Sequence, residues 1–269
     1  MSVRDSFLQF KGVFKMAIKD AIAYKFEFVI WMIAHPIWLA ALYFVWKAIY
    51  AYSGVDVIRG FTFLGFINYM ILATIVGTAT WVGVDYRTAD EVRRGTLIRY
   101  IVKPVSYYRN ALYSNIGWRF FAFSFESLPI VIFAIFFLGL TTTNIYFVLF
   151  TISVILAFVL NYTFTFIFGL MAFWLVKIGG IIRVRNGLEV LLKGFVMPIS
   201  FFPIWFQKVS NILPFQYVVY VPAQIFLQNF TLLQSVVSIV IQLLWIVVLL
   251  TVAKIIWRRG YIRFAGVGM

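Results

Sequence analysis

Two ionisable residues within one long apolar block, Arg119 and Glu126, are the side chains that most clearly suggest a function. They are seven residues apart, so they share nearly the same face if the block is a helix. Ionisable groups inside a membrane-spanning helix are costly and usually face protein or water. We expect Glu126 to stabilise a contact between helices rather than to bind a cargo, whereas Arg119 either joins such a contact or extends to the membrane interface. Asn161, in the following block, is expected to form a hydrogen bond between helices.

The most polar stretch of the chain spans residues 85–109 and predicts a short charged helix. Thr88 and Glu91 fit a capping box, in which the Thr88 hydroxyl accepts a hydrogen bond from the amide of Glu91 and the Glu91 side chain reaches back. Asp90 and Glu91 would also lie favourably at the positive end of the helix dipole, and Gly95 can end the helix after about two turns. The residues that we single out here are Thr88, Asp90, Glu91, Arg93, Arg94 and Gly95.

Several kinds of catalytic and binding chemistry have no candidate residues in this sequence. There is no GxxxxGK[ST] phosphate loop, so the chain lacks a nucleotide site of that type. There is no HExxH or GxSxG pattern, and the absence of cysteine excludes thiol catalysis and cysteine metal sites. The single histidine, His35, lies in an apolar block, where we expect it to be packed or hydrogen-bonded. The sequence therefore predicts no catalytic, metal-binding or cofactor-binding residues and favours a protein that is not an enzyme.

The elements that would position these polar residues are long apolar blocks. Hydrophobic residues make up 64% of the chain and charged residues only 12%, whereas an ordinary soluble domain is about 25% charged. A helix needs about 20 apolar residues to cross the hydrocarbon core of a membrane. The blocks of about that length are residues 26–46, 61–84, 117–140, 145–176, 188–206 and 232–257. We therefore expect an all-α membrane protein with six transmembrane helices, and one transmembrane domain over residues 1–269, since no internal repeat or linker interrupts the sequence.

The fifth block is the least regular, because Lys193, Pro198 and Pro203 interrupt it. We expect it to be a kinked or partly re-entrant helix. The following residues 203–230 are aromatic, divided by prolines and nearly uncharged, which is typical of a segment at headgroup depth. We expect this segment to form an outer re-entrant helical hairpin that dips into the outer leaflet. The residues that define the hairpin are Pro203, Pro214, Phe215 and Pro222.

The residues before the first block predict an amphipathic helix. Within residues 1–25, Phe7, Phe10 and Phe14 recur at three- or four-residue steps, while lysines form a second stripe four residues apart. An apolar face beside a lysine stripe is typical of a helix that lies in the membrane interface. The alternative is a basic leader surrounded by solvent, and the recurrence of phenylalanine on one face favours the interfacial helix.

The net charge of +14 is distributed in a way that predicts the orientation of the chain. If both termini lie inside, nearly all lysines and arginines fall in inner segments, as the positive-inside rule requires. The inner set includes four residues that follow the fourth block, namely Lys177, Arg183, Arg185 and Lys193. We therefore expect a multi-pass protein of the cell (inner or plasma) membrane, with both termini cytoplasmic and its basic residues in contact with anionic lipids. Nucleic acid is not needed as a partner to explain the charge.

Two parts of the sequence resemble a known family. Residues 90–106, with Gly95, Lys103 and Pro104, resemble the segment between the second and third spans of ABC-2-type transporter permeases, where a G-x-L … L-x-K/R-P pattern is typical. The segments similar to that family's fifth span and outer hairpin are residues 191–198, 202–203, 213–215 and 220–222. The resemblance covers nearly the whole chain. It is closest to the small permeases encoded in pairs beside an ATPase, among which drug and viologen exporters are named.

The resemblance implies a transmembrane subunit of an ATP-driven exporter. It implies that residues 1–25 form a connecting helix and that residues 84–109 form a cytosolic coupling loop that docks on a separate ATPase. Two ATPase subunits would bind ATP and Mg²⁺, and a second permease chain, like or unlike this one, would complete the cargo path. Charges on the docking helix would set register and partner choice, so the substitution Glu91→Arg would weaken the association. We expect an amphipathic, drug-like or lipid-like cargo.

Two other classes of function are open on the sequence alone. An ion-coupled secondary transporter or a channel would need ionisable residues along several spans, and here Glu126 and His35 stand nearly alone. A membrane enzyme or a scaffold that transports nothing would need a polar constellation that the sequence does not provide.

Overall fold

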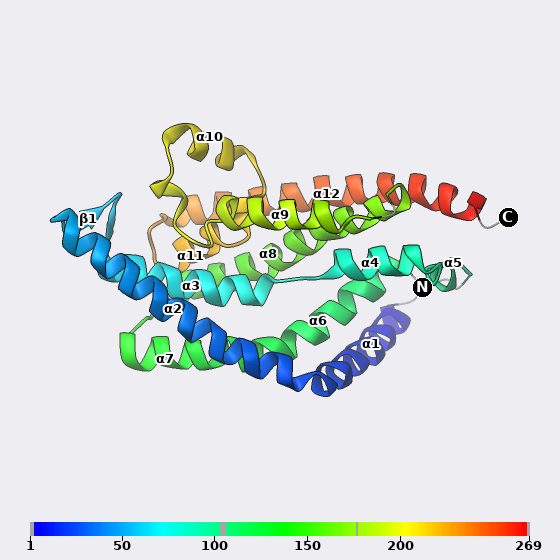
Figure 1. Cartoon of the computed structure of the whole chain (residues 1–269), viewed down its shortest axis with the longest axis horizontal. Helices are drawn as coiled ribbons and strands as arrows, with labels where there is room; N and C mark the ends of the chain where they lie inside the picture. The colour runs from blue at the N-terminus through cyan, green and yellow to red at the C-terminus, as the bar shows by residue number, and fades with distance from the viewer. Residues whose placement is uncertain (1–2, 103–105, 176, 268–269) are drawn as a thin grey trace.

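The protein is built of helices that lie side by side along its longest axis (Figure 1). The computed structural model describes residues 3–102, 106–175 and 177–267. Within these residues the α-helices are α1 (Val3–Ala23), α2 (Lys25–Ser53), α3 (Phe63–Thr80), α4 (Val84–Arg93), α5 (Ile98–Val102), α6 (Tyr107–Glu126), α7 (Leu128–Leu138), α8 (Asn144–Leu170), α9 (Gly179–Leu192), α10 (Ile204–Ile212), α11 (Tyr220–Phe226) and α12 (Leu232–Val267). The shorter elements are β1 (Val57–Ile58), β2 (Phe61–Thr62), η1 (Met171–Phe173), η2 (Ile199–Phe201) and η3 (Phe215–Tyr217). The expected all-α class is confirmed, and β1 and β2 form only a small antiparallel hairpin.

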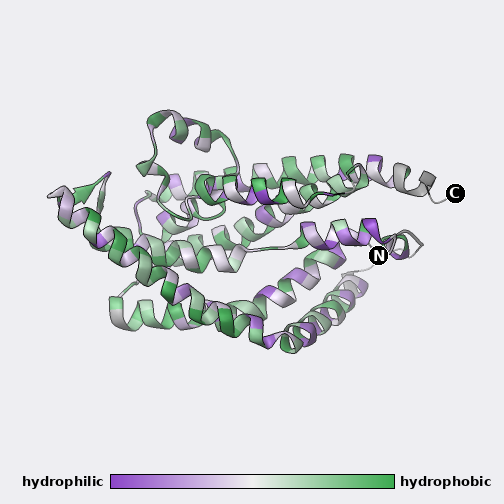
Figure 2. Ribbon diagram, in the orientation of Figure 1, coloured by the Kyte–Doolittle hydropathy of each residue, from purple (hydrophilic) through white to green (hydrophobic). Residues whose placement is uncertain are grey.

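Several of these helices are long and apolar enough to cross a membrane. Among the described residues, four candidate spans run over Lys25–Ser53, Phe63–Arg93, Asn144–Phe173 and Leu232–Ile262. Helices α6 and α7 make a fifth candidate if the 43° bend between them lies within one span. Pro129, in the first turn of α7, has no backbone N–H, so it cannot continue the hydrogen bonds of α6 into α7. Hydrophilic residues gather on α4 and along α1, while the long helices are mostly hydrophobic (Figure 2).

The expected fifth block, residues 188–206, is not one continuous helix, and it overlaps α9 only over residues 188–192. Helix α9 begins at Gly179, within a segment that we expected to be an inner loop, and ends at Leu192. Gly194 then adopts a left-handed conformation with a φ of 73°, which is a common way to end a helix. The 14 residues of α9 span about 21 Å at 1.5 Å per residue, less than the hydrocarbon thickness of about 30 Å. A sixth span therefore stays a prediction.

Helix α3 is the centre of the bundle. In the candidate span that contains it, 61% of the most apolar window is buried inside the protein, against 6% for α2. The main hydrophobic core surrounds α3 and includes residues of α8, α11 and α12. Because α3 is enclosed by other helices, its ends can be held in place by side chains from several of its neighbours.

The predicted leader helix is confirmed as α1, and its small residues pack against α6. Ala17 and Ala21 are buried. A Cβ atom added at Gly117 of α6 would lie 2.9 Å from both the Ala17 Cβ and the Phe14 carbonyl oxygen. The absence of a side chain at Gly117 therefore allows the two helices to touch through their backbones. Whether α1 also lies in the membrane interface stays a prediction.

Candidate functional site

Between α3 and α4 the chain is not helical over residues 81–83, a short segment that we call the break. Helix α3 ends at Thr80, and Trp81 takes an extended conformation before α4 begins. The last carbonyl groups of a helix have no partners within the helix. Here two side chains from other helices supply donors, since Arg119 Nη1 donates to the Thr78 carbonyl at 2.7 Å and Asn161 Nδ2 donates to the Thr80 carbonyl at 2.8 Å. The prediction that Asn161 forms an interhelical hydrogen bond is confirmed.

Arg119 does not extend to the interface but lies buried beside the break. Its guanidinium is 3.4 Å from the Glu126 carboxylate and 5.3 Å from the centre of the Trp81 ring. Arg119 and Glu126 are only 8% and 5% exposed. Glu126 lies on the same helix as Arg119, so it contacts the arginine that joins α6 to α3 and does not itself reach another helix; its expected role in a contact between helices stays a prediction.

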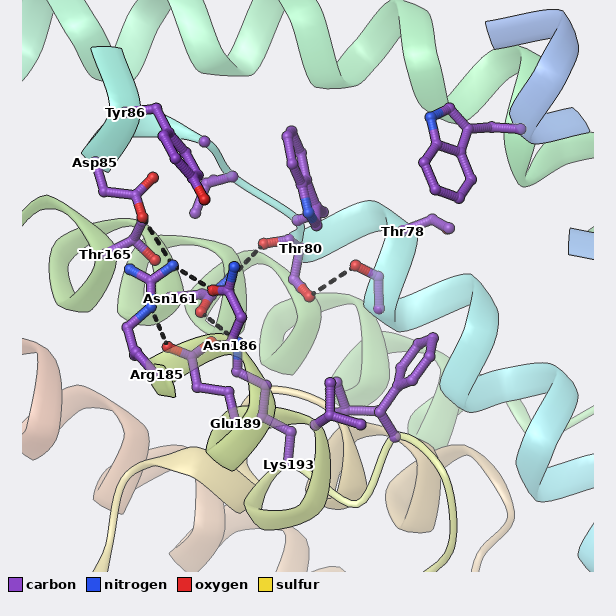
Figure 3. Close-up of a pocket in the computed structure, with 18 of the residues that line it drawn as sticks. Thr78, Thr80, Asp85, Tyr86, Asn161, Thr165, Arg185, Asn186, Glu189 and Lys193 are labelled. Carbon is purple, nitrogen blue, oxygen red and sulfur yellow. Dashed lines mark hydrogen bonds and ion pairs between the residues drawn. The ribbon is translucent and has the colours of Figure 1, made fainter. Parts of the chain in front are cut away.

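A second group of charged side chains, which we call the ion network, consists of Asp85, Arg185, Glu189 and Lys193 (Figure 3). Arg185 Nη2 lies 2.8 Å from Asp85 Oδ2 on α4, and Arg185 Nε lies 3.1 Å from Glu189 Oε1 on α9. The other Glu189 oxygen pairs with Lys193. Lys193 Nζ in turn donates to Asn161 Oδ1 at 2.8 Å. A continuous polar path thus joins α4 to α9, to α8 and, through Asn161, to the end of α3.

The ion network balances its own charge, with two carboxylates and two cations. Asp85, Arg185 and Glu189 are 1%, 7% and 6% exposed, so the network is almost entirely removed from solvent. An unpaired buried charge carries a desolvation penalty of several kcal/mol, whereas a paired and hydrogen-bonded one is compensated. The network therefore fixes the relative positions of α4 and α9, because any separation would leave a buried charge without a partner.

Most of the ion network was not predicted from the sequence. Arg185 was assigned to an inner loop in contact with lipid headgroups, and this is wrong because α9 places it inside the protein. The available signal was the spacing of Arg185, Glu189 and Lys193 at intervals of four residues with alternating sign. That spacing is typical of one face of a helix. Asp85, a hundred residues away in the sequence, gave no signal of its own as their partner.

The ion network and the break line a common cavity of about 340 Å³ (Figure 3). The remaining wall comes from α2, through Trp31 and His35, whose rings lie 5.6 Å apart. His35 packs against Trp31, as predicted, and Trp81, Tyr86 and Phe195 complete the aromatic lining. The cavity is thus enclosed by α2, α3, α4, α8 and α9, and it combines aromatic rings with a charge-balanced polar wall.

The local structure of α4 differs from the predicted capping box. Helix α4 begins at Val84, with Gly83 before it, so Thr88 lies in the middle of the helix. Thr88 is fully buried, and its hydroxyl accepts a hydrogen bond from the Tyr107 hydroxyl at 3.1 Å. The prediction that Gly95 ends this helix is confirmed, since Gly95 has a φ of 72° just after α4. Lys103 and Pro104, which contribute to the family resemblance, lie outside the described residues.

The charges of α4 divide into an inner and an outer set. Glu91 is buried and pairs with Arg87 at 3.1 Å. Asp90 pairs with Arg93 and Arg94, each at 2.8 Å, and both arginines are exposed. The expectation that Glu91 offers its charge to a partner is therefore wrong, because its carboxylate faces the bundle. Asp90, Arg93 and Arg94, which we call the outer face of α4, are the charges that a partner could reach.

Helix α4 rests directly on α8. A Cβ atom added at Gly169 would lie 2.8 Å from the Thr88 Cβ and 2.9 Å from the Asp85 Cα, closer than real Cβ atoms come to their neighbours. The absence of a side chain at Gly169 therefore seats the backbone of α4 against α8. On its other side α4 borders a cavity of about 590 Å³ that it shares with the start of α9, lined in part by Arg93, Lys177 and Arg183.

The residues of the predicted outer hairpin lie in the segment from α10 to α11. Pro203 directly precedes α10 and Pro214 directly precedes η3. The Phe215 ring packs edge-on against Phe164 of α8 at 5.0 Å, and Pro222 is buried within α11. The segment is thus anchored to the bundle at η3 and α11, while α10 projects away from it (Figure 1). Its entry into an outer leaflet stays a prediction.

Comparison with known proteins gives one family match. The sequence model of a family described as ABC-2 family transporter protein matches residues 36–268. The match begins within α2 and includes the break, the ion network and α4. A comparison with curated proteins finds none that matches the chain.

Proposed function

Since the chain belongs to the ABC-2 family of transporter proteins, and is therefore a multi-pass membrane permease of an ABC transporter, we propose that it works as the transmembrane subunit of an exporter. ATP hydrolysis on separate ATPase subunits would drive export of an amphipathic, drug-like or lipid-like substrate. The single observation that carries this proposal is the placement of α4. It is a charged helix seated on the bundle by Gly169 and joined to it by the ion network.

The outer face of α4 supports docking of an ATPase. Arg93 and Arg94 are exposed, and both are held by Asp90. The cavity between α4 and α9 adds Lys177 and Arg183 to the same region. Exposed charges of this kind set the register and choice of a partner more than its affinity. We propose that two ATPase subunits, which would carry the ATP and Mg²⁺, engage this surface in a complex that contains a second permease chain, like or unlike this one.

The ion network supports transmission of movement from α4 into the membrane-spanning helices. Asp85 lies in the first turn of α4 and contacts Arg185 of α9. Arg185 is connected through Glu189 and Lys193 to Asn161 of α8. Because each buried charge needs its partner, a shift of α4 moves α9 and α8 with it. The cavity at the break would then change shape in response to ATP binding on the partner.

The proposed topology has both termini and α4 in the cytoplasm of a cell bounded by its inner or plasma membrane. It is supported by the start of α1 and the end of α12, which lie toward the same end of the long axis as α4 and α5 (Figure 1), and by the abundance of lysine and arginine in these segments. In this topology α9 is the short fifth of six spans. Residues 203–230 lie on the outer side, and the whole chain forms one transmembrane domain.

An ion-coupled transporter or channel is the alternative, and one observation bears on it. The protein buries more ionisable side chains than the sequence indicated, namely the ion network together with Arg119 and Glu126. A site for a transported ion needs a charge that the protein leaves available. Here each buried group pairs with one of opposite sign, which favours a structural and transmitting role over ion binding.

The substitution Asp90→Arg tests the docking surface. It would place a third cation beside Arg93 and Arg94, and we expect the amount of ABC ATPase that co-purifies with the chain to fall about tenfold, equivalent to about 1.4 kcal/mol. The pairs that Asp90 forms are exposed and contribute at most about 1 kcal/mol to stability, so the variant should insert in the membrane normally. Co-purification is measured from detergent extracts by quantitative mass spectrometry.

The matched control is Lys208→Asp, a charge reversal at an exposed residue of α10. We expect this variant to retain the ATPase in full. Loss of the ATPase from Lys208→Asp, with normal retention in Asp90→Arg, would place the docking surface elsewhere and refute the assignment.

A further inference from the structure

A cavity of about 500 Å³ lies between α10 and the start of α12, away from the ion network. Its walls come from η2, α10, η3, α11 and α12. Among the described residues that line it, none carries a charge, and several carry amides or hydroxyls: Ser200, Gln207, Asn211, Gln216, Tyr220 and Gln234. This composition distinguishes the cavity from the one at the break, whose polar wall is ionic.

The walls of this cavity are held in place by hydrogen bonds within the segment. Gln207 Nε2 donates to the carbonyls of Ser200 and Phe202 at 3.2 and 2.8 Å, which fixes α10 against the turn before it. Gln216 Nε2 donates to Asn211 Oδ1 at 3.1 Å and joins η3 to α10. The cavity is therefore formed before any ligand arrives, which lowers the entropic cost of binding.

The opposite wall is fixed by the start of α12. Thr231 and Gln234 form a capping box, in which the Thr231 amide donates to Gln234 Oε1 at 2.9 Å and the Gln234 amide donates to Thr231 Oγ1 at 3.2 Å. Ser238, four residues after Gln234, lies on the same face of the helix and also lines the cavity. Both residues thus present polar groups from a rigid element.

The chemistry of the lining selects among kinds of ligand. An ion would be matched by side chains of opposite charge, and the described lining offers none. A hydrocarbon chain would leave the Ser200 hydroxyl unpaired, at a cost of about 1–3 kcal/mol, whereas the amides of Gln207 and Gln216 already have partners within the protein. Amides and hydroxyls both donate and accept hydrogen bonds, as neighbouring hydroxyls of a sugar do, and the Ser200 hydroxyl is buried without a partner in the protein.

We propose that this cavity binds an uncharged, polyhydroxylated sugar headgroup. The rings of Tyr220 and Phe230, whose centres lie 6.4 Å apart at 75°, offer apolar surfaces for the carbon face of the sugar. The volume lies within the range of about 300–1,000 Å³ that is usual for small-molecule sites. The source is either a glycolipid or a free sugar. The inference goes beyond export and does not depend on ATP coupling.

The test uses the full chain alone in nanodiscs of phosphatidylcholine that contain monoglucosyl diacylglycerol. Ser238→Phe fills the cavity with a ring, and we expect it to lower the retained glucolipid, measured by native mass spectrometry, about tenfold. Ser200→Ala removes only the unpartnered hydroxyl and should weaken retention about fivefold, as expected for the loss of one buried hydrogen bond. The matched control is Val240→Phe, which adds the same ring to an exposed position of α12 that does not line the cavity and should retain the glucolipid.

Two further arms identify the source and the specificity. Displacement of the glucolipid by soluble methyl glucoside would support binding of the free sugar. If the glucolipid stays bound in the presence of methyl glucoside, and its binding still depends on Ser238, the result would support a glycolipid. Equal retention of phosphatidylglycerol would overturn the proposal, because that headgroup is charged. Equal retention by Ser238→Phe and Val240→Phe would also overturn it, since the cavity would then hold only water. Each arm is read without an ATPase, so its result is independent of the docking proposal.

Discussion

Arg185→Leu is expected to lower the free energy of unfolding by about 3–5 kcal/mol, the usual cost of removing one partner from a buried ion pair. The substitution leaves Asp85 without its cation and leaves Glu189 with Lys193 alone. Both carboxylates are almost fully buried, so little solvent reaches the charges that the arginine balanced. The measurement is the unfolding of the purified chain in mixed micelles with increasing denaturing detergent, followed by circular dichroism.

The control for this prediction is Arg183→Leu, since Arg183 is an exposed arginine on the same helix. A surface substitution of this kind usually changes stability by no more than about 0.5 kcal/mol. The double variant Asp85→Leu, Arg185→Leu removes a complete pair and should be more stable than Arg185→Leu alone, because the remaining Glu189 and Lys193 still balance. Equal stability of the Arg183 and Arg185 variants would show that the ion network does not hold α4 to α9.

Gly169→Leu is expected to displace α4 from α8 and to reduce the co-purified ABC ATPase about tenfold. Any side chain at this position would clash with Thr88 and Asp85 of α4, and overpacking of this kind costs about 1–3 kcal/mol. The clash lies between α8 and α4, so the residues of the outer face would be unchanged. The outer face itself would be displaced relative to the rest of the bundle. The measurement is the ratio of ATPase to permease in the purified complex.

Gly187→Leu is the matched control for Gly169→Leu. Gly187 also lies within a helix, α9, and a Cβ atom there would meet nothing within 4 Å. We expect this variant to keep the ATPase. If both glycine variants retain the ATPase equally, the seating of α4 on α8 has no part in docking.

The sequence predicted the elements whose residues are uniformly apolar. Helices α2, α8 and α12 coincide closely with apolar blocks, since no buried charge interrupts them. The bend after Glu126 was not predicted, although Pro129 is a clear local signal. Hydropathy measures how a residue interacts with water, so it predicts spans well where neighbours are lipid or other apolar side chains.

The sequence could not predict helices that bury charges in pairs. The charge of Arg185 made the first half of α9 resemble a loop, because hydropathy counts each charge as exposed. In the folded protein Arg185 is neutralised by Glu189 on α9 and by Asp85 on α4. Pairs of this kind arise only when distant segments meet, so one sequence contains no local pattern for them.

The capping box at Thr88 failed for a related reason. The pattern of a threonine followed three residues later by a glutamate also occurs inside helices, and here the helix has already begun at Val84. Thr88 instead contacts Tyr107, and Glu91 contacts Arg87. The tertiary contacts of α4 therefore decide which of its charges face outward, and the sequence alone assigned Glu91 to the wrong side.

The central claim is that energy reaches this chain from a separate ATPase through the outer face of α4. The chain contains no cysteine, so Arg94→Cys provides a single thiol on that face for a thiol-linked photo-crosslinker, and Lys208→Cys provides the same probe on α10. In native membranes we predict that Arg94→Cys forms a covalent product with an ABC ATPase, identified by mass spectrometry, and that Lys208→Cys does not. A product with the ATPase from Lys208→Cys alone would contradict the account.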